Sequence, residues 1–147
     1  MARLQDRGLS MDERLSFLWE GAFDPEEAVT MLLSLEILDS AWKELLSRFR
    51  VSDREAFLCH MQGREREYEQ FCVYLCYRYL LGAADGEDLA KKCALIVWAY
   101  NLLVSLGAFW YAERGDFTVE DAIELCRLFS SEIEYNEDNL EAILLSL

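Results

Sequence analysis

The chain has 147 residues, of which 53% are hydrophobic, and its 28 acidic and 14 basic side chains give a formal charge of −14. A chain of this length and apolar content is expected to form one domain with a dense core, and its acidic balance argues against nonspecific nucleic-acid binding, which needs a basic surface. Its five cysteines are odd in number and irregularly spaced, and no signal peptide is recognised, so a reducing cytoplasm is expected rather than a disulfide framework.

A single proline, few glycines and no strand pattern of any length predict an all-α protein. Four N-cap signals predict helix starts in the first half of the chain. They are Ser10–Glu13, whose short helix runs through Trp19, then Asp24–Glu27, Asp39 or Ser40, and Ser52–Glu55. Apolar residues at helical spacing follow the last three signals: Val29, Leu32, Leu33, Leu35 and Ile37; Trp42, Leu45, Leu46 and Phe49; and Phe57, Leu58 and Met61.

Two long apolar helices are expected at the centre of the fold. The first covers about residues 64–81. The second covers residues 86–114, with Asp85 as its N-cap and Gly115 just beyond its end. The link between them is only a few residues long, which predicts an antiparallel hairpin with the other helices bundled around it.

The second of these helices contains an uncharged run, residues 93–111, that is also long enough for a transmembrane span. Asn101, Ser105 and Gly107 dilute this run, and the neighbouring amphipathic helices need an apolar partner. The chain also lacks a basic loop to set an orientation in a bilayer. We therefore expect a buried core helix, with the membrane span as the alternative.

The last part of the chain is strongly acidic. Residues 115–147 contain nine Asp or Glu and one basic residue, Arg127, which gives a net charge of −8. Helices are expected to start at Thr118 and Asn136, the first with one apolar face: Val119, Ile123, Cys126, Phe129 or Ser130, and Ile133. The acids form either a solvated helix surface or a surface that attracts a basic, lysine-bearing partner.

The sequence shows no recognisable catalytic or metal-binding motif. Cys72 and Cys76 share a helical face, but a tetrahedral zinc site needs four ligands and the chain has one histidine, His60. We therefore interpret Cys72, Cys76, Cys93 and Cys126 as core residues and His60 as a surface residue, and we expect no metal site.

Arg78 and two glutamates are the charged side chains with the most distinctive positions. Arg78 stands alone in an apolar helix, where it either binds an anion or pairs with an acid of a neighbouring helix. Glu132 and Glu134 flank Ile133 and diverge on a helix, so these two alone are not expected to form a carboxylate pair.

Three stretches of the sequence resemble the C-terminal region of the flagellin lysine-N-methylase (FliB-like) family. They cover most of the chain from Leu35 onward, and the last is the most specific. The family often has a histidine where Tyr135 stands in this chain. The stretches are LEILDSAWKELL (35–46), YEQFCVYLCYRYL (68–80), and FTVEDAIEL (117–125) leading into FSSEIEYNEDNLE (129–141).

The resemblance implies a bacterial protein that methylates lysine ε-amines of flagellin, with S-adenosylmethionine as the donor. The family's N-terminal half carries a clustered-cysteine motif associated with a metal or iron–sulfur cluster, and this chain has no counterpart of it. Residues 1–147 are therefore expected to form a single helical domain that corresponds to the C-terminal part of a longer architecture. No catalytic or cofactor-binding residue of the family can be placed on this chain.

Three functions follow as hypotheses, of which the third is the membrane protein weighed above. The first is the helical region of a lysine N-methyltransferase, with flagellin or another lysine-bearing protein as its partner. The second is a non-catalytic helical interaction module that self-associates as a homo-oligomer. The substrate-binding residues expected under the first hypothesis are Arg78, Glu132, Glu134, Glu137 and Asp138.

Overall fold

The computed structural model describes residues 23–82 and 86–147, with side chains from residue 89 in the second range, and this part of the chain is all helical, without strands. The predicted all-α class is confirmed. The helix expected after Ser10 and the cap expected at Asp85 lie outside the described residues. The described elements are α2 (Pro25–Ser34), α3 (Ser40–Arg48), α4 (Arg54–His60), α5 (Arg66–Tyr79), α6 (Gly86–Arg114), α7 (Val119–Phe129), the π-helical turn η1 (Ser130–Glu134) and α8 (Glu137–Ser146).

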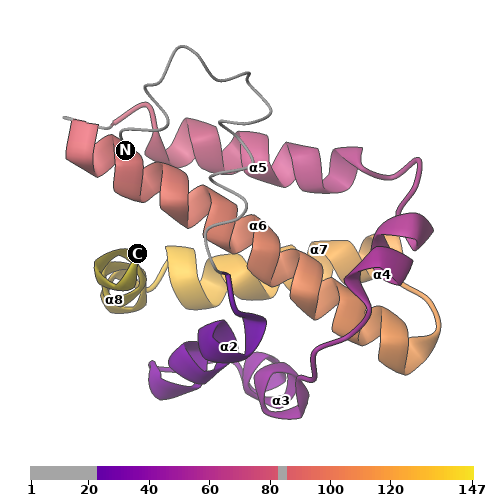
Figure 1. Cartoon of the computed structure of the whole chain (residues 1–147). Helices are drawn as coiled ribbons and strands as arrows, with labels where there is room; N and C mark the ends of the chain where they lie inside the picture. Colours follow the sequence, from indigo (N-terminus) through magenta and orange to yellow (C-terminus); the bar gives the residue numbers. More distant parts are fainter. Residues whose placement is uncertain (1–22, 83–85) are drawn as a thin grey trace.

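Helix α6 runs through the middle of the fold, and α2, α4, α5, α7 and α8 all pack against it (Figure 1). α5 lies beside α6 and runs in the opposite direction, so the predicted antiparallel hairpin is confirmed. α2 and α3 lie on the other side of α6 from α5 (Figure 1).

The burial of α6 follows from its composition. Successive helical residues point about 100° apart, and the consecutive side chains of Leu102, Leu103 and Val104 are all fully buried. Among the described residues, α6 is the one helix long and apolar enough to span a membrane, yet most of its apolar stretch is covered by the rest of the fold. The expected buried core helix is therefore present.

Two glycines, one within α6 and one directly after its last residue, are explained by the local structure. A Cβ atom at Gly107 would lie 2.7 Å from both Phe57 Cζ and Tyr68 Oη, so the absence of a side chain lets α4 and α5 approach α6 closely. Gly115 ends the helix with φ +76°, as predicted, and its N–H donates to the Tyr111 carbonyl at 2.8 Å.

Two of the predicted helix starts need correction. The N-cap of α4 is Asp53 rather than Ser52, because the Asp53 carboxylate accepts a hydrogen bond from Ala56 N at 3.0 Å. The helix expected over residues 64–81 is two residues shorter at each end, since α5 spans Arg66–Tyr79. The starts expected at Pro25, Asp39, Thr118 and Asn136 are confirmed, each with a side-chain cap.

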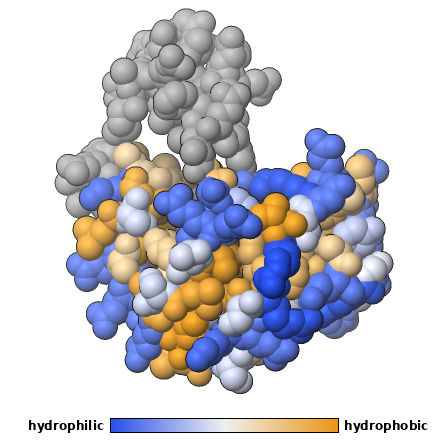
Figure 2. Space-filling view, turned by 60° about the horizontal axis from the view of Figure 1, so that its bottom comes forward, coloured by the Kyte–Doolittle hydropathy of each residue, from blue (hydrophilic) through white to orange (hydrophobic). Residues whose placement is uncertain are grey.

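One residue predicted to be buried lies at the surface. Leu33 is 41% exposed, because it lies off the core-facing side of α2, and Leu58 of α4 is likewise 39% exposed. Figure 2, which turns the α2–α3 side toward the viewer, shows a mainly hydrophilic surface interrupted by an apolar area.

Candidate functional site

Helix α7 has two apolar stripes. The stripe that packs into the core is not the one identified from the sequence. Leu125 and Leu128 are each 1% exposed, whereas Val119 and Ile123 are 48% and 64% exposed. The apolar face predicted from the sequence is therefore buried only in its second half, at Phe129 and Ile133. The consequence is an apolar stripe of α7 that the core does not cover.

This exposed stripe forms one wall of an open groove between α5 and α7, with a volume of about 380 Å³. The α5 residues that line it are spaced by three and four, which places them on one helix face. The lining residues are Glu67, Gln70, Phe71 and Tyr74 from α5, and Val119, Ala122, Ile123 and Cys126 from α7. The groove is thus mainly apolar, with a carboxylate, an amide and a phenol at its edges.

Tyr74, which lines the groove, donates its hydroxyl to a buried carboxylate, Glu134, whose side chain is 1% exposed. Arg78 Nε lies 3.0 Å from Glu134 Oε1, and this oxygen also accepts hydrogen bonds from the hydroxyls of Tyr74 at 3.2 Å and Tyr79 at 3.3 Å. The second oxygen, Oε2, accepts from Ser130 Oγ at 2.6 Å. Of the two interpretations of Arg78, the structure shows the ion pair with an acid of a neighbouring element.

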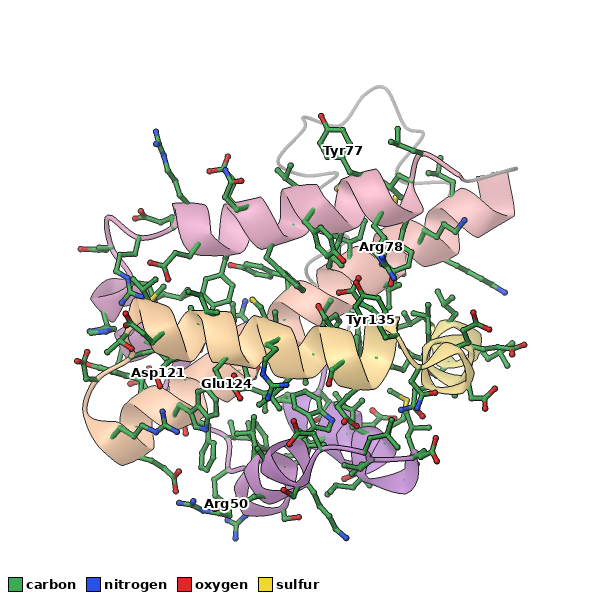
Figure 3. All side chains as sticks on the ribbon, turned by 180° about the vertical axis from the view of Figure 1, so that it is seen from behind. Arg50, Tyr77, Arg78, Asp121, Glu124 and Tyr135 are labelled. Carbon is green, nitrogen blue, oxygen red and sulfur yellow. The ribbon has the colours of Figure 1, made fainter. Side chains whose placement is uncertain are left out.

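A π-helical turn positions this carboxylate. In η1, Tyr135 N donates to the Ser130 carbonyl at 3.0 Å, five residues back in the chain, and such turns often mark functional sites. Tyr135 is 72% exposed, and the Arg78 guanidinium lies 5.1 Å from the centre of its ring. Figure 3 shows Arg78 reaching from α5 toward Tyr135, while Tyr77 points away.

Burial keeps the phenols of this cluster protonated. It raises the pKa of Tyr79 to about 12 and raises the pKa of Tyr74 above its ordinary value. Both hydroxyls therefore remain hydrogen-bond donors to Glu134 across the physiological pH range. The sequence placed both tyrosines in an apolar run but gave no sign that their hydroxyls converge on one carboxylate.

Glu132 points into a different part of the fold. Its side chain is buried, and its two oxygens accept hydrogen bonds from Leu38 N at 3.1 Å and Asp39 N at 2.7 Å. Asn139 Nδ2 donates to the backbone carbonyls of Glu132 and Glu36, each at 2.8 Å. Glu132 thus ties the link between α2 and α3 to η1. It does not share a site with Glu134, which agrees with the prediction that the two side chains diverge.

Glu137 and Asp138 lie in the first turn of α8 and are exposed. There they are close to the unpaired N–H groups of the helix start, which favours negative charge. The five residues predicted to bind substrate therefore lie in three settings: Arg78 and Glu134 together, Glu132 in the core, and these two acids at the surface.

The cysteines and the histidine have structural contacts. Burial raises the pKa of the Cys126 thiol to about 11 and raises the pKa of Cys72. His60 is only 25% exposed at its side chain and stacks on Tyr111 with ring centres 4.5 Å apart, so its placement on the surface was only partly right. Within the described ranges, no three His, Cys, Asp or Glu side chains gather as metal ligands would.

A family model described as the FliB lysine N-methylase C-terminal domain matches residues 21–147. This range includes every described helix. No curated protein matched the chain, and no solved structure matched it.

Proposed function

The chain belongs to the FliB lysine N-methylase C-terminal domain family, and on this premise we propose that it is the substrate-docking domain of a protein-lysine N-methyltransferase. The proposed acceptor is a lysine ε-amine of flagellin, the proposed donor is S-adenosylmethionine, and the proposed compartment is the cytoplasm. In this proposal the described helices hold the flagellin segment and are one domain of a longer enzyme.

The observation that carries the proposal is the open apolar groove between α5 and α7. Val119 and Ile123 expose large aliphatic side chains beside Phe71, although enough apolar sequence is present to fill the core. Grooves of this kind accept the apolar face of an amphipathic protein segment. Lysine side chains of such a segment would lay their methylene stems on the groove walls and keep their ammonium groups at the rim.

The acidic surface complements a lysine-bearing segment. Two acids of α7, both labelled in Figure 3, are already neutralised: Asp121 pairs with Arg114, and Glu124 pairs with Arg127 at 2.7 Å. The exposed acids of this region that have no ion-pair partner among the described residues are Glu120, Glu137, Asp138 and Glu141. Their uncompensated charge would steer a basic partner toward this region.

We assign different roles to the five predicted substrate-binding residues. In this proposal Glu137 and Asp138 attract the basic segment, and Arg78, whose side chain is 33% exposed, contacts a carbonyl or carboxylate of it. Glu132 and Glu134 act indirectly, because the first fixes the α2–α3 link and the second fixes Arg78 and Tyr74.

S-adenosylmethionine enters the proposal through the family alone. A strand, a glycine-rich turn and a helix are the usual cradle for a nucleotide, and the described part of the chain contains no strand. The starts of α2, α3, α7 and α8 are closed by side-chain caps of their own. These residues do not fit a nucleotide-type donor site, so we derive no step through the donor.

The groove is tested by substituting Ile123, whose 64% exposure allows a change without loss of the fold. Ile123→Arg adds size and a positive charge to the wall, so we expect at least about tenfold weaker flagellin binding by calorimetry. Leu145→Arg is the matched control, because Leu145 is 74% exposed on α8 and does not line the groove. Equal binding by the two variants would remove the groove from the proposal.

The same exposed groove also favours the second hypothesis, a self-associating module. Sedimentation of the purified chain separates the two functions. If the groove joins two copies, the wild-type chain sediments as a dimer and Ile123→Arg as a monomer. If it binds flagellin, both chains sediment alike and only their flagellin binding differs.

A further inference from the structure

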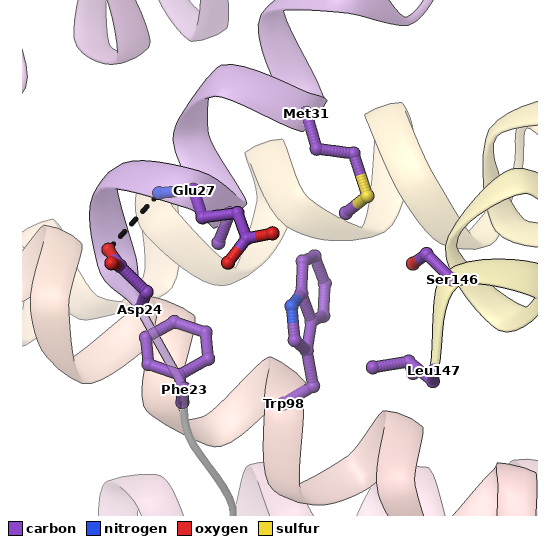
Figure 4. A pocket seen from close by; sticks show the side chains of 8 residues that line it. Phe23, Asp24, Glu27, Met31, Trp98, Ser146 and Leu147 are labelled. Atoms are coloured by element: carbon purple, nitrogen blue, oxygen red, sulfur yellow. Dashed lines mark hydrogen bonds between the residues drawn. The ribbon is translucent and has the colours of Figure 1, made fainter.

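A second cavity lies where the start of α2, the middle of α6 and the end of α8 meet (Figure 4). Its volume is about 320 Å³, which falls at the small end of the usual range for ligand sites, about 300–1,000 Å³. The lining residues are Phe23, Asp24, Glu27, Ala28, Met31, Trp98, Ser146 and Leu147. None of these residues belongs to the groove between α5 and α7.

The walls of this cavity combine aromatic rings with a thioether. Trp98 is 8% exposed and belongs to the hydrophobic core, and Phe23 and Met31 pack against that core. Figure 4 shows the indole of Trp98 standing in the cavity, with the carboxylate of Glu27 on one side and Leu147 on the other. The indole is therefore held in place by the core while part of its surface faces the cavity.

The two charged side chains that line the cavity, Asp24 and Glu27, are both negative. Asp24 caps α2 by accepting hydrogen bonds from Glu26 N at 2.8 Å and Glu27 N at 3.2 Å. The Glu27 carboxylate has neither an ion pair nor a hydrogen bond within the described ranges, and no basic residue lines the cavity. This differs from Glu134, Glu124 and Asp121, each of which lies against an arginine.

An aromatic wall beside an uncompensated carboxylate selects an organic cation. The ring face attracts the cation, apolar contacts accept its methylene or methyl groups, and the carboxylate neutralises its charge. We propose that this cavity binds the alkylammonium group of a lysine side chain, in its free or methylated form. The cavity itself selects an alkylammonium, and only the choice of lysine as its source rests on the proposed function.

The test uses small cations, so it does not depend on flagellin binding. Tetramethylammonium, Nα-acetyl-lysine amide and the Nε-trimethyl form of that amide are titrated into the full chain, with neopentyl alcohol as the neutral counterpart. The readout is the indole N–H resonance of Trp98, identified by its loss in Trp98→Phe. We expect a saturable shift with the cations and none with the alcohol.

Two variants separate a local carboxylate from the general acidity of the chain. Glu27→Gln should weaken cation binding about threefold to fivefold, the range for a partly exposed ion pair. Glu26→Gln removes the same charge one residue away, at a position that does not line the cavity, and should leave binding unchanged. The ratio of the two lysine forms then shows whether the cavity takes the methyl acceptor or its product.

Three results would overturn this assignment. They are an equal shift with neopentyl alcohol, equal weakening by the Glu26 and Glu27 variants, or a tighter saturable shift with S-adenosylmethionine, whose sulfonium is also an organic cation. A chain that fails this test and still binds flagellin through Ile123 would leave the proposed function intact. A chain that binds the cations but not flagellin would remove the proposed function alone.

Discussion

At the residue scale, the carboxylates of η1 are structural in a way that the sequence could not reveal. Both occur in an acidic segment whose composition suits a solvated surface, yet Glu132 and Glu134 are 1% and 5% exposed. Apart from Ser130, their side-chain partners lie 55 to 94 residues away in the chain, on α5 and on the α2–α3 link. Only the tertiary fold brings those donors to the carboxylates. The local spacing therefore predicted that Glu132 and Glu134 diverge, but it could not predict that both are buried.

Replacing Glu132 should destabilise the fold. Glu132→Ala leaves the N–H groups of Leu38 and Asp39 without their acceptor, and the loss should cost about 2–3 kcal/mol of unfolding free energy. Urea denaturation followed by circular dichroism measures it. Glu141→Ala, at an exposed site of α8, is the control and should change stability by less than about 0.5 kcal/mol. Equal effects of the two substitutions would show that Glu132 does not tie the link.

The cysteines should differ in their reaction with iodoacetamide. A thiol reacts as its thiolate, and the pKa of Cys126, raised to about 11 by burial, leaves little thiolate near pH 8. Cys59 is exposed and should be alkylated first, whereas Cys126 should react slowly and faster only as the pH rises. Mass spectrometry of the native chain over time gives the order. Equal rates for Cys59 and Cys126 without denaturant would contradict the partial burial of Cys126.

At the element scale, α6 was the most predictable helix and α7 the least. The bounds of α6 follow from one long apolar run and from Gly115, and both signals are local. In α7, apolar residues occur on two faces, and either face satisfies the helical period. Which face is buried depends on how α7 packs against α6, and the periodicity of the sequence carries no information on that packing. The structure buries Leu125 and Leu128 and exposes Val119 and Ile123. The candidate groove was therefore invisible in the sequence.

The contact of α4 and α5 with α6 can be tested at Gly107. Gly107→Ala would place a methyl group 2.7 Å from Phe57 Cζ and Tyr68 Oη, both on packed aromatic side chains. We expect a loss of about 1–3 kcal/mol in unfolding free energy. Gly82→Ala is the control, because a Cβ there meets nothing within 4 Å. A Gly107 variant as stable as the control would mean that these helices do not approach as closely as described.

At the scale of the whole molecule, two different parts of the surface offer the two features that a lysine-bearing partner would need. The groove between α5 and α7 offers apolar contact, and the unpaired acids of α7 and α8 offer charge. The chain's formal charge of −14 was evident in the sequence, but the structure was needed to show which acids are already paired with arginines. Membership of a lysine N-methylase family fits a surface of this kind.

The most direct test of the account is hydrogen exchange of the chain with and without flagellin, read by mass spectrometry. We predict slower exchange in peptides from α5 (Arg66–Tyr79) and α7 (Val119–Phe129), whose exposed faces form the groove, and unchanged exchange in α3 (Ser40–Arg48). Saturating binding that leaves α5 and α7 unprotected, or that protects α3 instead, would contradict the claim that this groove is the docking site.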